Sequence, residues 1–154
     1  DIEKKRKENL KYFTGKFLQK YPMYSSKTVL GRQLFKYARA GEDVEAPTRA
    51  VNVKALKFTK SRTISRAKLL ANISKRIKKV NGDFRQKEIL DIWNKYLRTS
   101  TLKYEQGESL LIGSFKIKCS SGTYVRGIAN ALGDRIGIPA LAFSIKRTKI
   151  GKWK

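Results

Sequence analysis

The stretch from Ser114 to Ile136 constrains the fold most, because its apolar residues change period in the middle. Phe115, Ile117 and Cys119 alternate with polar residues, which is typical of a strand buried on one side. After small residues at 120–123, apolar residues recur three or four apart along one helix face: Val125, Ile128, Ala129, Leu132 and Ile136. A serine or threonine of the turn is expected to cap this helix. The sequence therefore predicts a strand, a tight turn and a helix in direct succession.

Arg126 lies in the first turn of this predicted helix, where the helix dipole carries partial positive charge and favours acidic residues. One interpretation is a solvated or ion-paired arginine on the surface. The other is an arginine held in a cleft against a carboxylate or phosphate, because its planar guanidinium group matches two oxygens at once. This stretch by itself leaves both interpretations open.

The chain is strongly basic, with 36 Lys and Arg residues against 12 Asp and Glu residues and a formal net charge of +24. Such an excess indicates an anionic partner, and nucleic acid is the leading candidate. No apolar run approaches the roughly 18 residues of a membrane span, so we expect a soluble protein without a membrane partner. The 154 residues correspond to one domain or part of one.

Cys119 is the only cysteine, and histidine is absent. An internal disulfide is therefore impossible, and a reducing cytoplasm is the expected location. A zinc or iron site lacks its usual ligands, so no metal is expected. Pairs of serine or cysteine with histidine are also excluded, which leaves carboxylates, tyrosines and lysines as acid–base groups.

Other periodicities and turn residues predict the remaining elements. These are helices over 1–12, 27–39, 63–80 and 84–97, strands over 49–58, 110–119 and 140–148, a short extended segment at 16–19, and loops at 20–26 and 42–47. Gly41 and Gly137 are expected to end the helices that precede them. The helices over 63–80 and 84–97 flank a turn at 81–83 and are expected to pack on each other as a hairpin.

Apolar stripes define the inward faces of these elements. Val51, Val53 and Ala55 share one side of the strand over 49–58, and the strand over 140–148 presents Leu141, Phe143 and Ile145. In the hairpin, the expected stripes are Leu70, Ile73, Ile77 and Val80 on the first helix, and Ile89, Trp93, Tyr96 and Leu97 on the second.

Three segments have two interpretations each. The aromatic residues at 20–26 either stack on splayed bases or cover the core. Glu42 and Asp43 form either an ordinary polar loop or a pair of carboxylates for metal or acid–base chemistry. The outer surface of the hairpin either extends an RNA footprint or is a solubilising basic decoration.

Several motifs of the chain resemble, in the correct order, segments of TruB-type tRNA pseudouridine synthases. The downstream motifs are Cys119–Arg126, Ala131–Gly133, Gly137–Ala140 and Ile145–Thr148, and the upstream motifs are Phe13–Gly15, Gln19–Lys27 and Tyr37–Gly41. The resemblance covers residues 13–58 and 108–152. It implies an α+β fold in which a mixed, mostly antiparallel sheet is flanked by helices.

The resemblance also implies domain boundaries and roles for particular residues. Residues 1–154 would be one partial catalytic domain, with a tRNA-gripping excursion at 20–49 and an inserted basic helical hairpin at 60–104. Arg126 would be the catalytic arginine that pairs with the catalytic aspartate, and Tyr124 and Ile145 would line the pocket of the flipped uridine. The residues that grip the T arm of tRNA would be Tyr24, Ser25, Lys27, Arg32 and Arg39.

The family isomerises uridine 55 of the tRNA T arm without a cofactor or metal, and it needs an aspartate carried in a Gly-Thr-Leu-Asp-Pro segment. No such segment occurs here, since Asp1, Asp43, Asp83, Asp91 and Asp134 lie in other contexts. The family's trailing RNA-binding domain is also missing. We therefore expect a fragment that is inactive alone, needs the N-terminal half of the catalytic domain as its partner, and is monomeric when complete. The alternative is a non-catalytic basic RNA-binding module, which the charge alone does not distinguish.

Overall fold

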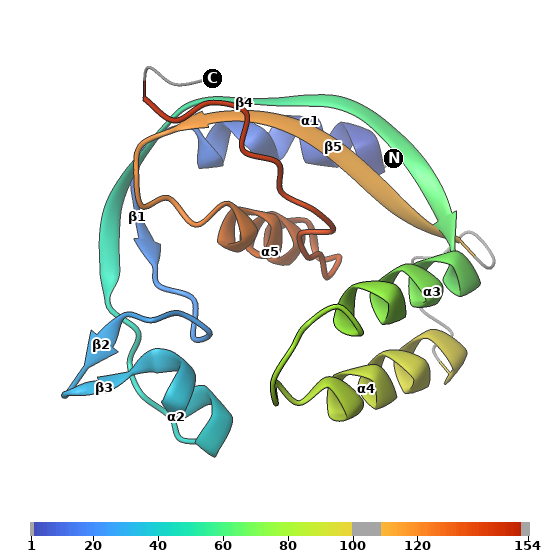
Figure 1. Ribbon diagram of the computed structural model, residues 1–154. Helices are drawn as coiled ribbons and strands as arrows, with labels where there is room; N and C mark the ends of the chain where they lie inside the picture. The colour runs from blue at the N-terminus through green and yellow to red at the C-terminus, as the bar shows by residue number, and fades with distance from the viewer. Residues whose placement is uncertain (1, 100–108, 152–154) are drawn as a thin grey trace. The chain divides into compact units, whose positions relative to one another are not determined.

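A computed structural model describes residues 2–99 and 109–151 of the chain. The chain folds into two compact units, one made of residues 1–58 and 115–154 and the other of residues 59–114. Two long strands, β4 (Thr48–Ser65) and β5 (Ser109–Cys119), contribute to both units and are hydrogen-bonded neighbours in one sheet (Figure 1).

The first unit contains most of the regular structure. Its further elements are α1 (Ile2–Asn9), the 3-10 turn η1 (Leu10–Phe13), β1 (Gly15–Lys20), β2 (Thr28–Val29), β3 (Arg32–Gln33), α2 (Leu34–Ala40) and α5 (Val125–Ile136). The helix predicted over 1–12 is confirmed over Ile2–Asn9 and continues as the 3-10 turn η1, while residue 1 lies outside the described residues.

The sheet has the strand order β1-β4-β5, with β4 in the centre. β1 pairs with β4 in antiparallel register, from Gly15 opposite Val53 to Lys20 opposite Thr48. β5 is also antiparallel to β4, because Asn52 contacts Ser120 whereas Phe58 contacts Phe115. This architecture confirms the predicted α+β fold with a mostly antiparallel sheet and flanking helices.

The core of the first unit is small. Its buried apolar side chains are Leu10, Leu34, Val51, Val53, Ile128 and Leu132. Each such side chain stabilises the fold by about 1.5–3 kcal/mol when it is fully buried. Helix α5 lies beside α1 (Figure 1), and Arg135 donates from Nε to Asn9 Oδ1 at 2.9 Å across this contact.

Helix α5 confirms the predicted strand, turn and helix. It begins at Val125, so Arg126 lies in its first turn, and it ends at Gly137, whose φ of 73° is left-handed. Ile128 and Leu132 are buried, as the apolar stripe indicates. Along β5, Phe115, Ile117 and Cys119 are less exposed than the lysines between them, which confirms the alternation.

The predicted helix over 27–39 begins seven residues late. Residues 28–33 form the two-stranded β2–β3 hairpin instead, and α2 starts at Leu34. Leu30 and Gly31 form the turn with φ values of 49° and 77°, which a right-handed helix cannot contain. The predicted end at Gly41 is confirmed, because its φ is 68°.

The predicted strand over 49–58 is confirmed but differs in length and in one inward residue, and the predicted strand over 140–148 is wrong. β4 is longer than predicted, and beyond Val53 the less exposed residues become Leu56 and Phe58, so that Ala55 faces solvent. The segment over 140–148 is irregular, and Leu141 and Ile145 are 58% and 55% exposed. Alternation of apolar and polar residues is compatible with the two faces of a strand, but a strand forms only where its backbone groups pair with those of a neighbouring strand. Residues 140–148 form no such pairing with the described residues.

The second unit contains two packed helices, as predicted for the hairpin, together with the ends of β4 and β5, and residues 100–104 of the predicted insert lie outside the described residues. Helix α3 (Arg66–Ile77) starts at Ser65, whose side chain accepts from the backbone N–H of Lys68 at 3.3 Å, and helix α4 (Gln86–Thr99) packs on it. The buried residues of the hairpin are Leu69 and Leu97.

On α3 the predicted residues Leu70, Ile73 and Ile77 are among the less exposed ones, whereas the inward face of α4 is rotated slightly from the predicted stripe. Val80 lies beyond the end of α3 and is 47% exposed. On α4, Ile89 and Tyr96 are 37% and 39% exposed, whereas Leu90, one position further along, is less exposed. The side of α4 that packs is therefore centred on Trp93 and Leu97, and the predicted stripe runs along the edge of that side.

Candidate functional site

The turn between β5 and α5 is tied to the central strand. The backbone N–H of Ser120 donates to the carbonyl of Asn52 at 2.8 Å, and the backbone N–H of Asn52 donates to Ser120 Oγ at 3.0 Å. Thr123 Oγ1 closes the turn by donating to the carbonyl of Ser120 at 2.9 Å. These bonds hold the start of α5 at one end of the sheet.

Gly122 provides the left-handed residue of this turn, with a φ of 77°. A Cβ atom at this position would lie 2.1 Å from Cζ of Arg49, so the guanidinium group of Arg49 covers the glycine directly. The left-handed conformation explains why this position is glycine, whereas the end of the flexible Arg49 side chain could move away from a larger residue.

The first backbone groups of α5 are bonded to a side chain from β1. The backbone N–H of Tyr124 donates to Gln19 Oε1 at 2.8 Å, and Gln19 Nε2 donates to the carbonyl of Tyr124 at 2.9 Å. The expected cap from a serine or threonine of the turn is wrong, because Thr123 bonds to Ser120 and the capping position is Tyr124. Gln19 therefore orients the start of the helix that carries Arg126.

Replacing Gln19 with alanine is expected to remove both bonds and lower the free energy of unfolding by about 1–3 kcal/mol, because two partly buried backbone groups lose their partner. Urea unfolding of the two proteins measures the difference. Gln33→Ala is the matched control, because the side chain of Gln33 makes no hydrogen bond to another described residue, and it is expected to change stability by about 0.5 kcal/mol or less. Equal stability of Gln19→Ala and the parent chain would contradict this role.

Arg126 connects the start of α5 to the proline loop at 20–26. Its side chain is exposed, and its Nη2 donates to the backbone carbonyl of Tyr24 at 2.5 Å. Its Cζ lies 5.7 Å from the ring centre of Tyr124. Among the described residues no carboxylate forms an ion pair with Arg126. The structure thus places this guanidinium group against a carbonyl, with donors that a further anion can use.

Aromatic rings and a lysine lie around this arginine. The rings of Tyr21 and Tyr124 meet edge to face, with centres 5.6 Å apart, and Lys27 Nζ lies 5.5 Å from the centre of the Tyr21 ring. The ring of Tyr24 is 56% exposed. Sequence reasoning selected Tyr24, Lys27 and Tyr124 but missed Gln19 and Tyr21. Both residues lie within a motif quoted above, yet no local pattern indicates their contacts with Tyr124, which is more than 100 residues away in the sequence.

Ser25 lies in the same loop but is buried, at 7% exposure. Its carbonyl accepts from the backbone N–H of Phe35 at 3.2 Å, and its Oγ has no partner among the described residues. The loop is therefore attached to the start of α2 at this residue.

Arg32 and Arg39 contact aromatic rings of the β3–α2 segment. Arg32 Nη1 donates to Glu42 Oε2 at 2.6 Å, and its Cζ lies 4.7 Å from the ring centre of Tyr37. The hydrogen bond that Arg32 donates to Glu42 raises the pKa of Arg32 above its ordinary value. Arg39 lies over the ring of Phe35, at 5.2 Å from its centre. Of the two carboxylates considered above, Glu42 is thus engaged in an ion pair.

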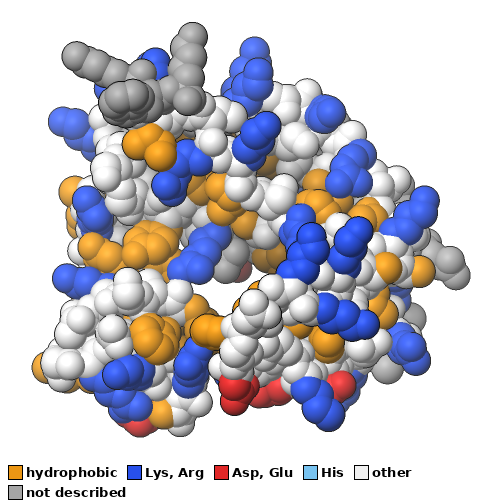
Figure 2. Space-filling view, in the orientation of Figure 1, with side chains coloured by type: hydrophobic (Ala, Val, Ile, Leu, Met, Phe, Trp, Pro, Cys, Tyr) orange, Lys and Arg blue, Asp and Glu red, His pale blue; other side chains and the backbone are white. Residues whose placement is uncertain are grey.

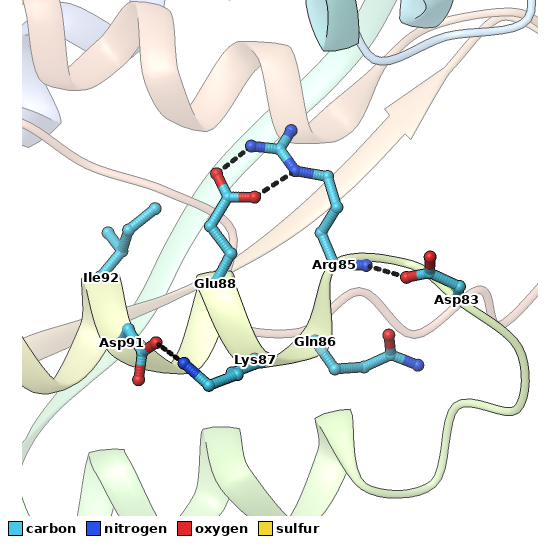
Figure 3. A pocket seen from close by; sticks show the side chains of 7 residues that line it. All are labelled: Asp83, Arg85, Gln86, Lys87, Glu88, Asp91 and Ile92. Atoms are coloured by element: carbon cyan, nitrogen blue, oxygen red, sulfur yellow. Dashed lines mark hydrogen bonds and ion pairs between the residues drawn. The ribbon is translucent and has the colours of Figure 1, made fainter.

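The second unit contains an open pocket at the start of α4 (Figure 3). Its lining residues are Asp83, Arg85, Gln86, Lys87, Glu88, Asp91 and Ile92. Arg85 holds the carboxylate of Glu88 with two nitrogens, which lowers the pKa of that carboxyl, and Lys87 pairs with Asp91 at 3.0 Å. Because the charges of these two pairs neutralise each other, we interpret the pocket as the N-terminal structure of α4 and not as a ligand site.

Two further observations concern residues 2–99 and 109–151, which are the residues that the structure describes. None of the helices in these ranges is both long and apolar enough to cross a membrane. Within the same ranges, histidine, cysteine and carboxylate side chains do not gather in groups of three or more that could hold a metal ion.

The sequence matches the TruB family pseudouridylate synthase (N terminal domain) over residues 2–83, which is more than half of the chain. The chain therefore belongs to the TruB family. The match includes the proline loop, α2, β4 and α3.

Bacterial relatives extend the similarity over most of the chain. The tRNA pseudouridine synthase B of Lactococcus lactis subsp. cremoris (strain MG1363) is 29% identical over 139 residues, 90% of this chain and 30% of that protein. The proteins of the same name from Streptococcus agalactiae (serotype III, strain NEM316) and Pediococcus pentosaceus are 32% and 31% identical, covering 90% and 96% of this chain but 33% and 36% of those proteins. The chain thus spans about a third of the length of these relatives.

Proposed function

We propose that the chain is part of a tRNA pseudouridine synthase that isomerises uridine 55 in the T arm. Membership of the TruB family and the names of the relatives support the reaction class. The net charge of +24 suits a phosphate-rich substrate. In this reaction the bond between uracil N1 and the ribose breaks, the base rotates, and a bond from uracil C5 to the same ribose carbon forms; C5 loses a proton to solvent and N1 gains one, so the product is an isomer of uridine.

The observation that carries the proposal is the bond between Arg126 and the carbonyl of Tyr24. It joins the segment expected to bind the target nucleotide to the segment expected to grip the T arm. A uridine that leaves a stacked loop needs its phosphate and its base held at the same time. The arginine provides donors for the phosphate, and the rings of Tyr21, Tyr24 and Tyr124 provide surfaces for stacking.

We assign the further roles as follows. Arg126 is the catalytic arginine that orders the flipped nucleotide and pairs with the catalytic aspartate, while Tyr124 and Ile145 line the pocket of the base. The T arm is gripped by Tyr24, Ser25, Lys27, Arg32 and Arg39. Ser25 acts through the shape of its loop because it is buried, whereas Lys27 is exposed and acts through charge.

In our proposal, none of the aspartates of this chain is the catalytic aspartate. Asp43 and Asp134 are exposed residues of a loop and of the last turn of α5, and no described carboxylate pairs with Arg126. We therefore propose that the aspartate comes from the N-terminal half of a catalytic domain and that these 154 residues alone are inactive. A non-catalytic RNA-binding module is the second candidate. It is favoured by the observation that no described carboxylate pairs with Arg126.

Release of tritium from tRNA labelled at uracil C5 tests the function. We expect no release with the chain alone, and release when the N-terminal half of the catalytic domain of a relative is added. That N-terminal half without the chain is the control. Release by the chain alone would show that the aspartate is among these residues. No release in any mixture, together with tight and salt-sensitive tRNA binding, would favour the non-catalytic module.

A further inference from the structure

The hairpin of the second unit carries basic residues that the proposed site does not use. No acidic residue occurs between Ala46 and Gly82. Within the second unit, this stretch contains Lys60, Arg62, Arg66, Lys68, Lys75, Arg76, Lys78 and Lys79. The positive charge is thus concentrated on one helix and the strand before it, and Lys and Arg side chains outnumber Asp and Glu on the face shown in Figure 2.

The lysines of α3 lie opposite its packed side. Lys68 and Lys75 are seven residues apart, so they lie on one face of α3, about 10 Å apart along its axis, and Lys78 and Lys79 follow directly after its last residue, Ile77. All four lysines are exposed. The other side of α3 is covered by α4, with Leu69 buried and Arg66 Nη1 donating to the carbonyl of Leu97 at 3.3 Å.

The acidic residues that the structure describes in this unit form no ion pair with these lysines. In the part of the unit that the structure describes, the acidic residues are Asp83, Glu88 and Asp91. Asp83 accepts from the backbone N–H of Arg85, Arg85 binds Glu88, and Lys87 binds Asp91. All three carboxylates are therefore engaged at the N-terminal end of α4, and no ion pair to Lys68, Lys75, Lys78 or Lys79 is present among the described residues.

We propose that the lysine face of α3, defined by Lys68 and Lys75 of the helix and by Lys78 and Lys79 directly after it, is a second RNA-binding surface that contacts the phosphate backbone of the tRNA outside the T arm. This proposal rests on the proposed function for the identity of the RNA. Lysines without acidic partners on a rigid helix bind phosphates as point charges, independently of sequence. A membrane surface fits less well, because a helix that lies in a membrane interface needs a free apolar face, and that of α3 is covered by α4.

The test measures binding of the 154-residue chain to an unmodified tRNA transcript at several salt concentrations. The variant replaces all four lysines with glutamine: Lys68→Gln, Lys75→Gln, Lys78→Gln and Lys79→Gln. We expect its Kd for tRNA to rise about tenfold or more, and the slope of log K against log salt to fall by about 2 to 3. Binding to a T-arm stem-loop alone is expected to change by less than about threefold, because those contacts belong to the first unit.

The matched control removes the same charge from the first unit through Lys4→Gln, Lys5→Gln, Lys116→Gln and Lys118→Gln, which are exposed lysines of α1 and β5. An equal loss in both variants would show a net-charge effect only and overturn the proposal, as would unchanged tRNA binding. The corresponding Lys→Arg variant of α3 keeps the charge and is expected to retain binding, so its weak binding would also contradict the proposal.

Binding to vesicles of phosphatidylcholine and phosphatidylserine tests whether the surface binds a membrane instead of tRNA. If the four lysines are needed for vesicles and not for tRNA, the surface binds membranes and the proposal is wrong. Failure of the proposed function is distinguishable, because tritium release can be absent while tRNA binding still depends on these lysines. Conversely, an active enzyme with unaltered tRNA binding in the α3 variant would refute only this inference.

Discussion

Replacing Arg126 with lysine is expected to reduce tritium release about a hundredfold or more in the complemented enzyme. The guanidinium group donates to the carbonyl of Tyr24 through Nη2, which leaves its other nitrogens for a phosphate or the catalytic carboxylate. A lysine ammonium at this position keeps the charge but cannot bind both groups in fixed geometry. Loss of one well-placed donor to the transition state typically costs 10²–10³ in rate, which is about 3–4 kcal/mol.

Arg135→Lys is the matched control, because it makes the same replacement on the same helix. Arg135 bonds to Asn9 and lies over the ring of Tyr12, on the part of α5 that contacts α1. We expect turnover within about threefold of the parent for this variant, since the change is outside the proposed site. Near-normal turnover of Arg126→Lys would sink the catalytic assignment, whereas an equal loss in both variants would indicate damage to α5 itself.

Replacing Gly133 with alanine is expected to lower the free energy of unfolding by about 2–4 kcal/mol. Gly133 is buried in α5, and a Cβ there would lie 2.6 Å from the backbone nitrogen of Ala140 and 2.7 Å from the carbonyl oxygen of Ile138. Backbone atoms cannot rotate away as a side chain can. Alanine is normally the better helix former by about 1 kcal/mol, so a loss of stability at this position isolates the steric effect. Urea or thermal unfolding measures it.

Gly137→Ala provides the comparison for Gly133→Ala. Gly137 ends the same helix with a φ of 73°, and no atom lies within 4 Å of a Cβ built there. Only conformational strain is expected, at a cost of about 1 kcal/mol. If Gly133→Ala were no more destabilising than Gly137→Ala, the close packing of the segment after α5 against this helix would be contradicted.

The parts of the fold that the sequence predicted are those that depend on neighbouring residues. The alternation at Phe115, Ile117 and Cys119, the apolar stripe of α5 and the left-handed glycines at Gly41 and Gly137 arise within a few residues of each other. The hairpin of α3 and α4 was predictable for the same reason, because each helix shows its period without reference to the other.

The predictions that failed share a different property. The segment over 140–148 has the alternation of a strand, yet a strand forms only where another strand pairs with it. The helix expected from Lys27 is interrupted at Leu30, which has a left-handed backbone conformation. Leucine rarely adopts this conformation, so the sequence did not indicate the interruption. Both elements were predicted from the spacing of apolar residues, but the structure of the first depends on strand pairing and that of the second on turn geometry.

The sequence by itself thus determined the order of elements around Arg126, the family to which the motifs point, and the excess of positive charge. Only the tertiary structure decided that Gln19 orients the start of α5, that Arg126 binds the carbonyl of Tyr24, and that the acidic residues of the hairpin are engaged away from the lysines of α3. The physical reason is distance along the chain. Periods, caps and composition are set by adjacent residues, whereas Gln19 and Tyr124 are 105 residues apart and meet only when β1, β4 and β5 have paired.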